Sequence, residues 1–104
     1  MAWLILLAAG LLEVAWVSGF KQLSLSKPLL SLAVVAAMIG SFALLWVAMR
    51  TLPVGTAYAV WTGIGAAGAA LIGILFLSEP ATAVRIGCIG LIIAGVAGLK
   101  LASG

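Results

Sequence analysis

Charged residues are scarce in this sequence. Only 7% of its 104 residues are charged, whereas soluble domains carry about 25%. So few charges cannot coat a water-facing surface, which excludes a soluble enzyme, a nucleic-acid-binding protein and a disordered segment. The net charge of +3 comes from basic residues scattered along the chain, and scattered charges form no patch that would attract nucleic acid.

Residues that bind metals or carry redox chemistry are also few. The sequence contains no histidine and no aspartate, and Cys88 is its single cysteine. Metal clusters, disulfide frameworks and histidine-based catalysis are therefore excluded. We expect a protein that is not an enzyme and that has neither a metal ion nor a cofactor.

Apolar residues, in contrast, make up 66% of the chain. A membrane-spanning helix needs about 20 such residues, so four helices would use roughly 80 and leave roughly 24 for loops. The polar breaks predict helices at about 2–20, 29–49, 54–77 and 83–102 in a single domain, residues 1–104. A barrel of eight strands does not fit this length. The prediction is an all-α, multi-pass membrane protein with four transmembrane helices.

The basic residues give almost no signal for orientation. One side of the membrane would carry Arg50 and Lys100, and the other would carry Lys21, Lys27 and Arg85. Acidic residues count little in this balance. Two interpretations therefore stay open. Either a weak signal still selects one orientation, or the chain inserts both ways and pairs with an inverted copy.

Glu13 is the single acidic residue within a predicted span. A charge at that depth costs on the order of 3 kcal/mol, and no lysine or arginine lies within a helical turn to offset it. Such a residue is a functional candidate. The alternative is a protonated glutamate that only forms a hydrogen bond between helices.

The neighbours of Glu13 suit a small cation. Residues three and four apart share a helix face. Ala9 and Gly10, one turn before Glu13, would leave space beside the carboxylate. Trp16, one turn after it, offers an indole N–H donor and a ring face that attracts cations. This face predicts half of a cation site.

The second and third predicted helices supply further pocket candidates. Tyr58 and Trp61 are spaced by three residues, so they share a face. Ser41 is the interior polar residue of the second helix. Its hydroxyl would bond either to a carbonyl of its own helix or to the carboxylate of Glu13.

Small residues mark two stretches for close helix contacts. Gly63 and Gly65 could form a hinge or could simply allow close packing, and both interpretations stay open. Gly90, Ala94 and Gly98 lie at four-residue spacing, which predicts a dimer seam on the fourth helix. Four helices are too few to enclose a pathway, whereas an inverted dimer would supply eight helices and two-fold symmetry within the membrane plane.

Four segments carry a resemblance to a known family. They are Leu12-Glu13-Val14 followed by Trp16, LPVGTAYAVWTGIG at 52–65, GIGAAGAALIGI at 63–74 and GLK at 98–100. Over essentially its whole length the chain resembles the small multidrug resistance family. At Trp16 and Thr62 the chain resembles the guanidinium-exporting branch rather than the broad drug-exporting branch.

The resemblance implies a proton-coupled antiporter that exports guanidinium and small guanidinyl cations. It also implies an antiparallel, dual-topology homodimer in the bacterial inner membrane. By position, Glu13 corresponds to the carboxylate that binds both protons and substrate. Trp16, Ser41, Tyr58 and Trp61 fall on positions that line the pocket.

Alternatives remain from the same family. A quaternary ammonium or multidrug exporter would rely on aromatic faces alone, because such cations have no N–H donors. The first loop is shorter than the family pattern and its proline is displaced to Pro28, which leaves room for a heterodimer of two related subunits.

Two alternatives from other classes are weaker. A rotor-like or proton-conducting subunit would need a buried carboxylate but no aromatic box, whereas this chain has Trp16, Tyr58 and Trp61. A passive assembly factor would not need Glu13.

Overall fold

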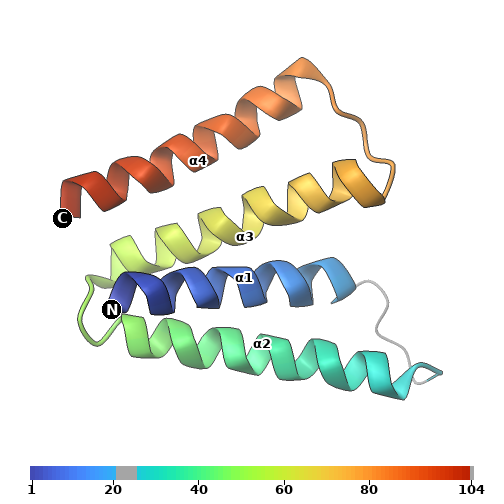
Figure 1. Ribbon diagram of the computed structural model, residues 1–104, viewed down its shortest axis with the longest axis horizontal. Coiled ribbons are helices and arrows are strands. Elements are labelled where there is room, and N and C mark those ends of the chain that lie inside the picture. Colours follow the sequence, from blue (N-terminus) through green and yellow to red (C-terminus); the bar gives the residue numbers. More distant parts are fainter. Residues whose placement is uncertain (21–25, 104) are drawn as a thin grey trace.

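The structure is a computed structural model that describes residues 1–20 and 26–103. These residues form four long α-helices (Figure 1), each long and apolar enough to cross a membrane. The all-α class with four potential spans is therefore confirmed. The helices are α1 (Ala2–Phe20), α2 (Pro28–Ala48), α3 (Val54–Phe76) and α4 (Ala83–Ser103).

A proline marks the start of α2, and a residue with left-handed backbone conformation follows the end of α3. α2 begins at Pro28, one residue before the predicted start, because proline suits a first helical turn in which its missing N–H is not needed. α3 ends at Phe76, one residue early. Ser78 has a φ of 58°, and the backbone N–H groups of Leu77 and Glu79 both donate to the Gly73 carbonyl. The predicted Lys21 break falls largely on residues 21–25, outside the described part of the chain.

The four helices form a thin layer (Figure 1). α1 lies between α2 and α3, and α4 packs mainly against α3. The chain measures 45 × 35 × 17 Å, so the layer is less than half as thick as it is wide. Large apolar side chains are exposed on all four helices.

The buried core lies where α1, α2 and α3 meet. It consists of small and medium apolar residues together with one indole ring: Leu6, Ala9, Leu45, Ala48, Ala57, Val60 and Trp61. Ser41 is the fully buried polar side chain of this region. α4 adds only a partly buried edge through Val96 and Leu99.

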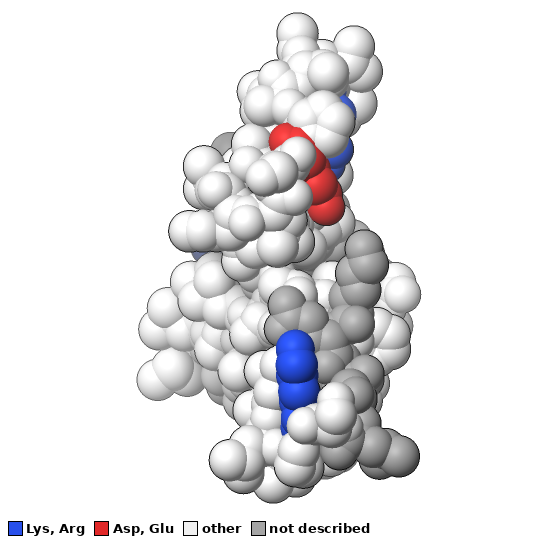
Figure 2. Space-filling view, turned by 90° about the vertical axis from the view of Figure 1, so that its right-hand side faces the viewer, with Lys and Arg blue, Asp and Glu red and all other residues white. Residues whose placement is uncertain are grey.

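Charged side chains are few on the face seen in Figure 2. At the end of the molecule where both termini lie (Figure 1), two cations stack on tryptophan rings. The Arg50 guanidinium lies 5.5 Å from the Trp46 ring centroid, and the Lys100 ammonium lies 5.1 Å from that of Trp3. Tryptophan and basic residues at helix ends are typical of a membrane–water interface.

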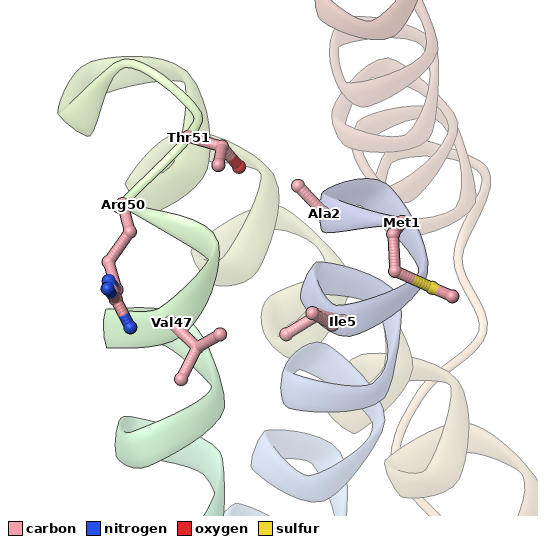
Figure 3. Close-up of a pocket in the computed structure, with 6 residues that line it drawn as sticks. All are labelled: Met1, Ala2, Ile5, Val47, Arg50 and Thr51. Atoms are coloured by element: carbon pink, nitrogen blue, oxygen red, sulfur yellow. The ribbon is translucent and has the colours of Figure 1, made fainter.

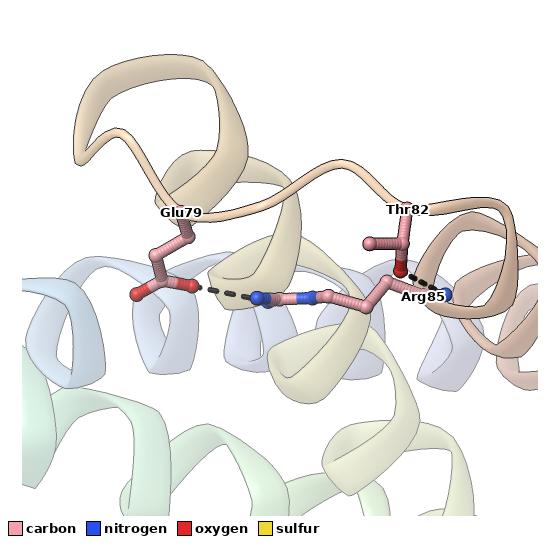
Figure 4. A network of polar contacts seen from close by, with 3 residues as sticks. All are labelled: Glu79, Thr82 and Arg85. Carbon is pink, nitrogen blue, oxygen red and sulfur yellow. Dashed lines mark hydrogen bonds and ion pairs between the residues drawn. The ribbon is translucent and has the colours of Figure 1, made fainter.

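The connection between α3 and α4 is held by polar contacts (Figure 4). Arg85 donates through Nη2 to Glu79 Oε1 at 3.1 Å. The Thr82 hydroxyl caps α4 by accepting the backbone N–H of Arg85 at 3.2 Å. The Glu79 carboxylate also lies against Gly73, where a Cβ atom would overlap it.

Candidate functional site

Glu13 lies in the second half of α1, on the side that faces α3. Its side chain is partly buried. Its Oε1 atom is buried and has no hydrogen-bond partner among the described residues. The carboxylate lies against the backbone of α3 at Gly65, because a Cβ atom at that position would overlap Oε1. Within α1, α2 and α3 there is no lysine, arginine or second carboxylate. Glu13 is thus an acidic group without a counter-charge on these helices.

Ser41 connects all three core helices, and both alternatives predicted for it were wrong. Its hydroxyl donates to the Ala9 carbonyl of α1 at 2.7 Å and accepts the Nε1–H of Trp61 at 2.9 Å. It therefore bonds neither to its own helix nor to Glu13. The small side chain of Ala9 lets α2 approach closely, and a carbonyl oxygen with two lone pairs can accept Ser41 beside its helical N–H.

Aromatic rings form a continuous row across α1, α2 and α3. Ring centroids are 6.1 Å apart for Trp16 and Phe42, 5.5 Å for Phe42 and Trp61, and 5.7 Å for Tyr58 and Trp61. Phe20 extends the row at 5.8 Å from Trp16. These edge and tilted contacts lie in the range of favourable aromatic pairs. The row joins Trp16, Tyr58 and Trp61, three of the predicted pocket residues.

Phe42 is the member of this row that sequence reasoning missed. It follows Ser41 directly, and its ring bridges Trp16 and Trp61. α2 is apolar on every side, so no periodicity separates a phenylalanine that faces the other helices from one that faces lipid. Adjacency to a buried serine was the only available signal.

The two indole N–H groups differ in what they can still bind. Trp61 Nε1 is engaged by Ser41, whereas Trp16 Nε1 is buried without a partner among the described residues. Trp16 therefore keeps a donor free on the same helix as Glu13. Trp61 contributes a ring face that is fixed in orientation by its hydrogen bond.

The space predicted beside Gly10 is filled. A Cβ atom at Gly10 would come within 2.6 Å of Ile64 Cγ2, so this glycine serves a close contact between α1 and α3. Gly63 meets Val96 of α4 in the same way. α3 runs as an uninterrupted helix through Gly63 and Gly65, so both are sites of close approach in this conformation.

The predicted seam on α4 is uncovered in the subunit. Gly90 and Gly98 have nothing within 4 Å of where a Cβ atom would lie, and Ala94 is exposed. These residues lie apart from Glu13, which belongs to the contact between α1 and α3. Their role at a dimer interface remains a prediction.

Glu13 lines neither of two surface cavities. One, of about 310 Å³, lies between the start of α1 and the loop after α2 (Figure 3), with Arg50 and Thr51 on one wall and Met1 and Ala2 on the other. The second, of about 280 Å³, is almost wholly apolar. The carboxylate and the aromatic row thus lie outside both of these cavities.

The sequence model described as Small Multidrug Resistance protein matches residues 1–92. The chain belongs to the small multidrug resistance family. It is 57% identical to the guanidinium exporters of Citrobacter freundii and Salmonella typhimurium, over 99% of this chain and 99% of each relative. The guanidinium exporter of Yersinia pseudotuberculosis is 55% identical, over 99% of this chain and all of the relative.

The family and the helices together establish the class of protein. The chain is a multi-pass protein of the inner membrane, and it belongs among exporters rather than among enzymes.

Proposed function

We propose that this chain is a proton-coupled antiporter that exports guanidinium and small guanidinyl cations across the inner membrane. The observation that carries the proposal is its 57% identity, over nearly the whole chain, to proteins named guanidinium exporters. The geometry around Glu13 supplies the chemistry.

A carboxylate and a guanidinium ion match in shape as well as in charge. Guanidinium is planar, and two parallel N–H groups can donate to the two oxygens of one carboxylate. Glu13 supports such a contact, because it has no basic partner on α1 to α3 and its Oε1 atom receives no hydrogen bond from a described residue. The ring faces of Trp16 and Trp61 would stabilise the cation's positive charge.

Exchange follows if protons and substrate use the same oxygens. A protonated carboxyl group loses the charge that holds guanidinium, and a bound guanidinium excludes the proton. Protons would displace the substrate on the acidic side of the membrane, and the freed carboxylate would take up a new cation on the other side.

An antiparallel homodimer would complete the site. The subunit is a layer 17 Å thick, and one copy leaves Glu13 outside the two cavities described. A second copy would bring another Glu13 and another aromatic row. The uncovered stripe of Gly90, Ala94 and Gly98 supports a helix-to-helix seam, and the even distribution of basic residues supports inverted insertion.

Transport by purified protein tests this proposal. Proteoliposomes with an imposed proton gradient should exchange guanidinium, and a tetraalkylammonium ion of similar charge should be exchanged poorly. Preference for the tetraalkylammonium ion would favour the multidrug alternative. Absence of any exchange by the single gene product, with activity restored by a related subunit, would favour a heterodimer.

A further inference from the structure

Position 65 is where α3 touches the carboxylate of Glu13. Gly65 is buried, and a Cβ atom there would overlap Oε1 and Cδ of Glu13. The absence of a side chain at this position therefore creates a recess on α3, and the Glu13 carboxylate fills it.

Other glycines at helix contacts face different chemistry. Gly10, Gly63 and Gly68 meet the aliphatic side chains of Ile64, Val96 and Val14, respectively. Gly73 meets a carboxylate, that of Glu79, but this one lies in an exposed loop and is paired with Arg85. Among the described residues, Gly65 is thus the glycine whose missing side chain makes room for a partly buried carboxylate on a membrane helix.

Hydrogen bonds do not hold Glu13 in this place. Its Oε1 atom has no donor among the described residues. The Ser41 hydroxyl donates to Ala9, and the Trp61 N–H donates to Ser41, so neither of these two donors is given to Glu13. Close packing against Gly65 rather than hydrogen bonding fixes the carboxylate, and no described donor competes with a proton or a cation for Oε1.

We propose that Gly65 is a positioning residue, a seat on α3 that fixes the Glu13 carboxylate by steric fit and leaves its oxygens free for exchange. The inference deepens the proposed function and rests on it. It assigns Gly65 a role that neither a hinge nor general helix packing requires, because the contact that matters is with the exchanging group itself.

The substitution Gly65→Ala isolates this role. Alanine stabilises a helix interior relative to glycine. The group that its Cβ atom displaces, the Glu13 carboxylate, is the far end of a flexible side chain, so α3 should remain folded. The carboxylate should move out of its recess. We expect guanidinium affinity to fall about tenfold, the scale of one charge-assisted hydrogen bond lost.

Gly68→Ala is the matched control. It lies one turn further along α3 and also faces α1, but its Cβ atom would overlap a methyl group of Val14. It adds the same crowding between the same helices without touching the carboxylate. Equal losses in both variants would assign the effect to packing and overturn the proposal.

A pH titration supplies a readout that packing alone would not move. Glu13 and Glu79 are the only acidic side chains, so in a Glu79→Gln background the labelled carboxyl carbon of glutamate gives one NMR signal. No other charged group lies on α1, α2 or α3, and Tyr58 is the other titratable side chain there. Gly65→Ala should move the titration midpoint of this signal, whereas Gly68→Ala should leave it in place. If Gly65→Ala neither moves the titration midpoint nor changes guanidinium affinity, Gly65 does not position the carboxylate and the proposal is wrong.

A compensating substitution completes the test. Glu13→Asp shortens the side chain by one methylene, which removes the two atoms that a Cβ atom at position 65 overlaps most, Oε1 and Cδ, and leaves the smaller overlap at Cγ. Adding Gly65→Ala to Glu13→Asp should therefore lower affinity clearly less than it does in the wild type. Equal effects in both backgrounds would overturn the proposal. So would failure of both Gly65→Ala proteins to fold.

Failure of the proposed function would look different. If the wild type binds no guanidinium, the exporter assignment falls, and the NMR midpoints of the glycine variants still decide whether Gly65 seats the carboxylate.

Discussion

The indole N–H of Trp61 donates to the hydroxyl of Ser41 at 2.9 Å, and that hydroxyl donates in turn to the Ala9 carbonyl at 2.7 Å. This relay joins α3, α2 and α1 through two hydrogen bonds in the buried core. It also sets the angle of the Trp61 ring, against which Phe42 and Tyr58 pack. A structural hydrogen bond and the aromatic face offered to a cation are therefore coupled.

Ser41→Ala should destabilise the protein by about 1–3 kcal/mol, because it leaves the buried Trp61 N–H without an acceptor. Thermal unfolding in detergent measures the loss. Ser18→Ala is the matched control, because the Ser18 hydroxyl is buried without a partner among the described residues and its removal should cost little. In a Trp61→Phe background, which lacks the N–H, Ser41→Ala should cost clearly less. An equal cost in both backgrounds would contradict the coupling.

The helices could be predicted from the sequence because their boundaries are local. Pro53 and the Ser78-Glu79-Pro80 segment break apolar runs that are each long enough to span a bilayer. The observed ends differ from the predicted ones by one residue at several places: Pro28 sets the first turn of α2, and Ser78, with its positive φ, follows the end of α3.

The hydrogen-bond and packing partners of the site residues could not be predicted from the sequence, because they depend on which faces of the helices meet. Ser41 bonds across to Ala9, a residue 32 positions away. The helices are apolar on all sides, so their sequences carry little periodic signal for the inward face. Glu13 and Trp16 stood out as polar or aromatic groups deep in a span, whereas Phe42 and the contact of Gly65 with Glu13 required the tertiary arrangement.

Glu13→Gln should abolish proton-driven guanidinium exchange and leave the fold intact. The amide keeps the volume of the side chain, so it still fits the recess at Gly65, but it cannot alternate between binding a proton and binding a cation. Exchange in proteoliposomes and thermal unfolding in detergent are measured on the same preparation. Proton-driven export at the wild-type rate would remove Glu13 from the mechanism.

The chain should insert in both orientations. In a Cys88→Ala background, Ala102→Cys places a thiol near the end of α4, and an impermeant reagent should label it from either side of the inner membrane. Two lysines added to the loop at 49–53 should lock one orientation and impair activity when that chain is expressed alone. Two glutamates in the same loop are the control, since acidic residues count little. Labelling from one side alone would favour a parallel dimer or a heterodimer.

Guanidinium affinity should weaken as the pH falls. The cation binds the ionised carboxylate, and a proton bound to Glu13 removes the charge that holds the cation, so lower pH depletes the binding form. Affinity should rise with pH until Glu13 is fully ionised and then level off, because no histidine or other acidic group lies within the spans to titrate in its place. Equilibrium binding to the detergent-solubilised protein, from mildly acidic to mildly alkaline pH, measures this curve.

Glu79→Gln is the control and should leave the curve unchanged, because Glu79 lies in the loop between α3 and α4 and pairs there with Arg85. A flat curve in the wild type would mean that proton and substrate do not share Glu13, and the exchange would then need a different coupling group.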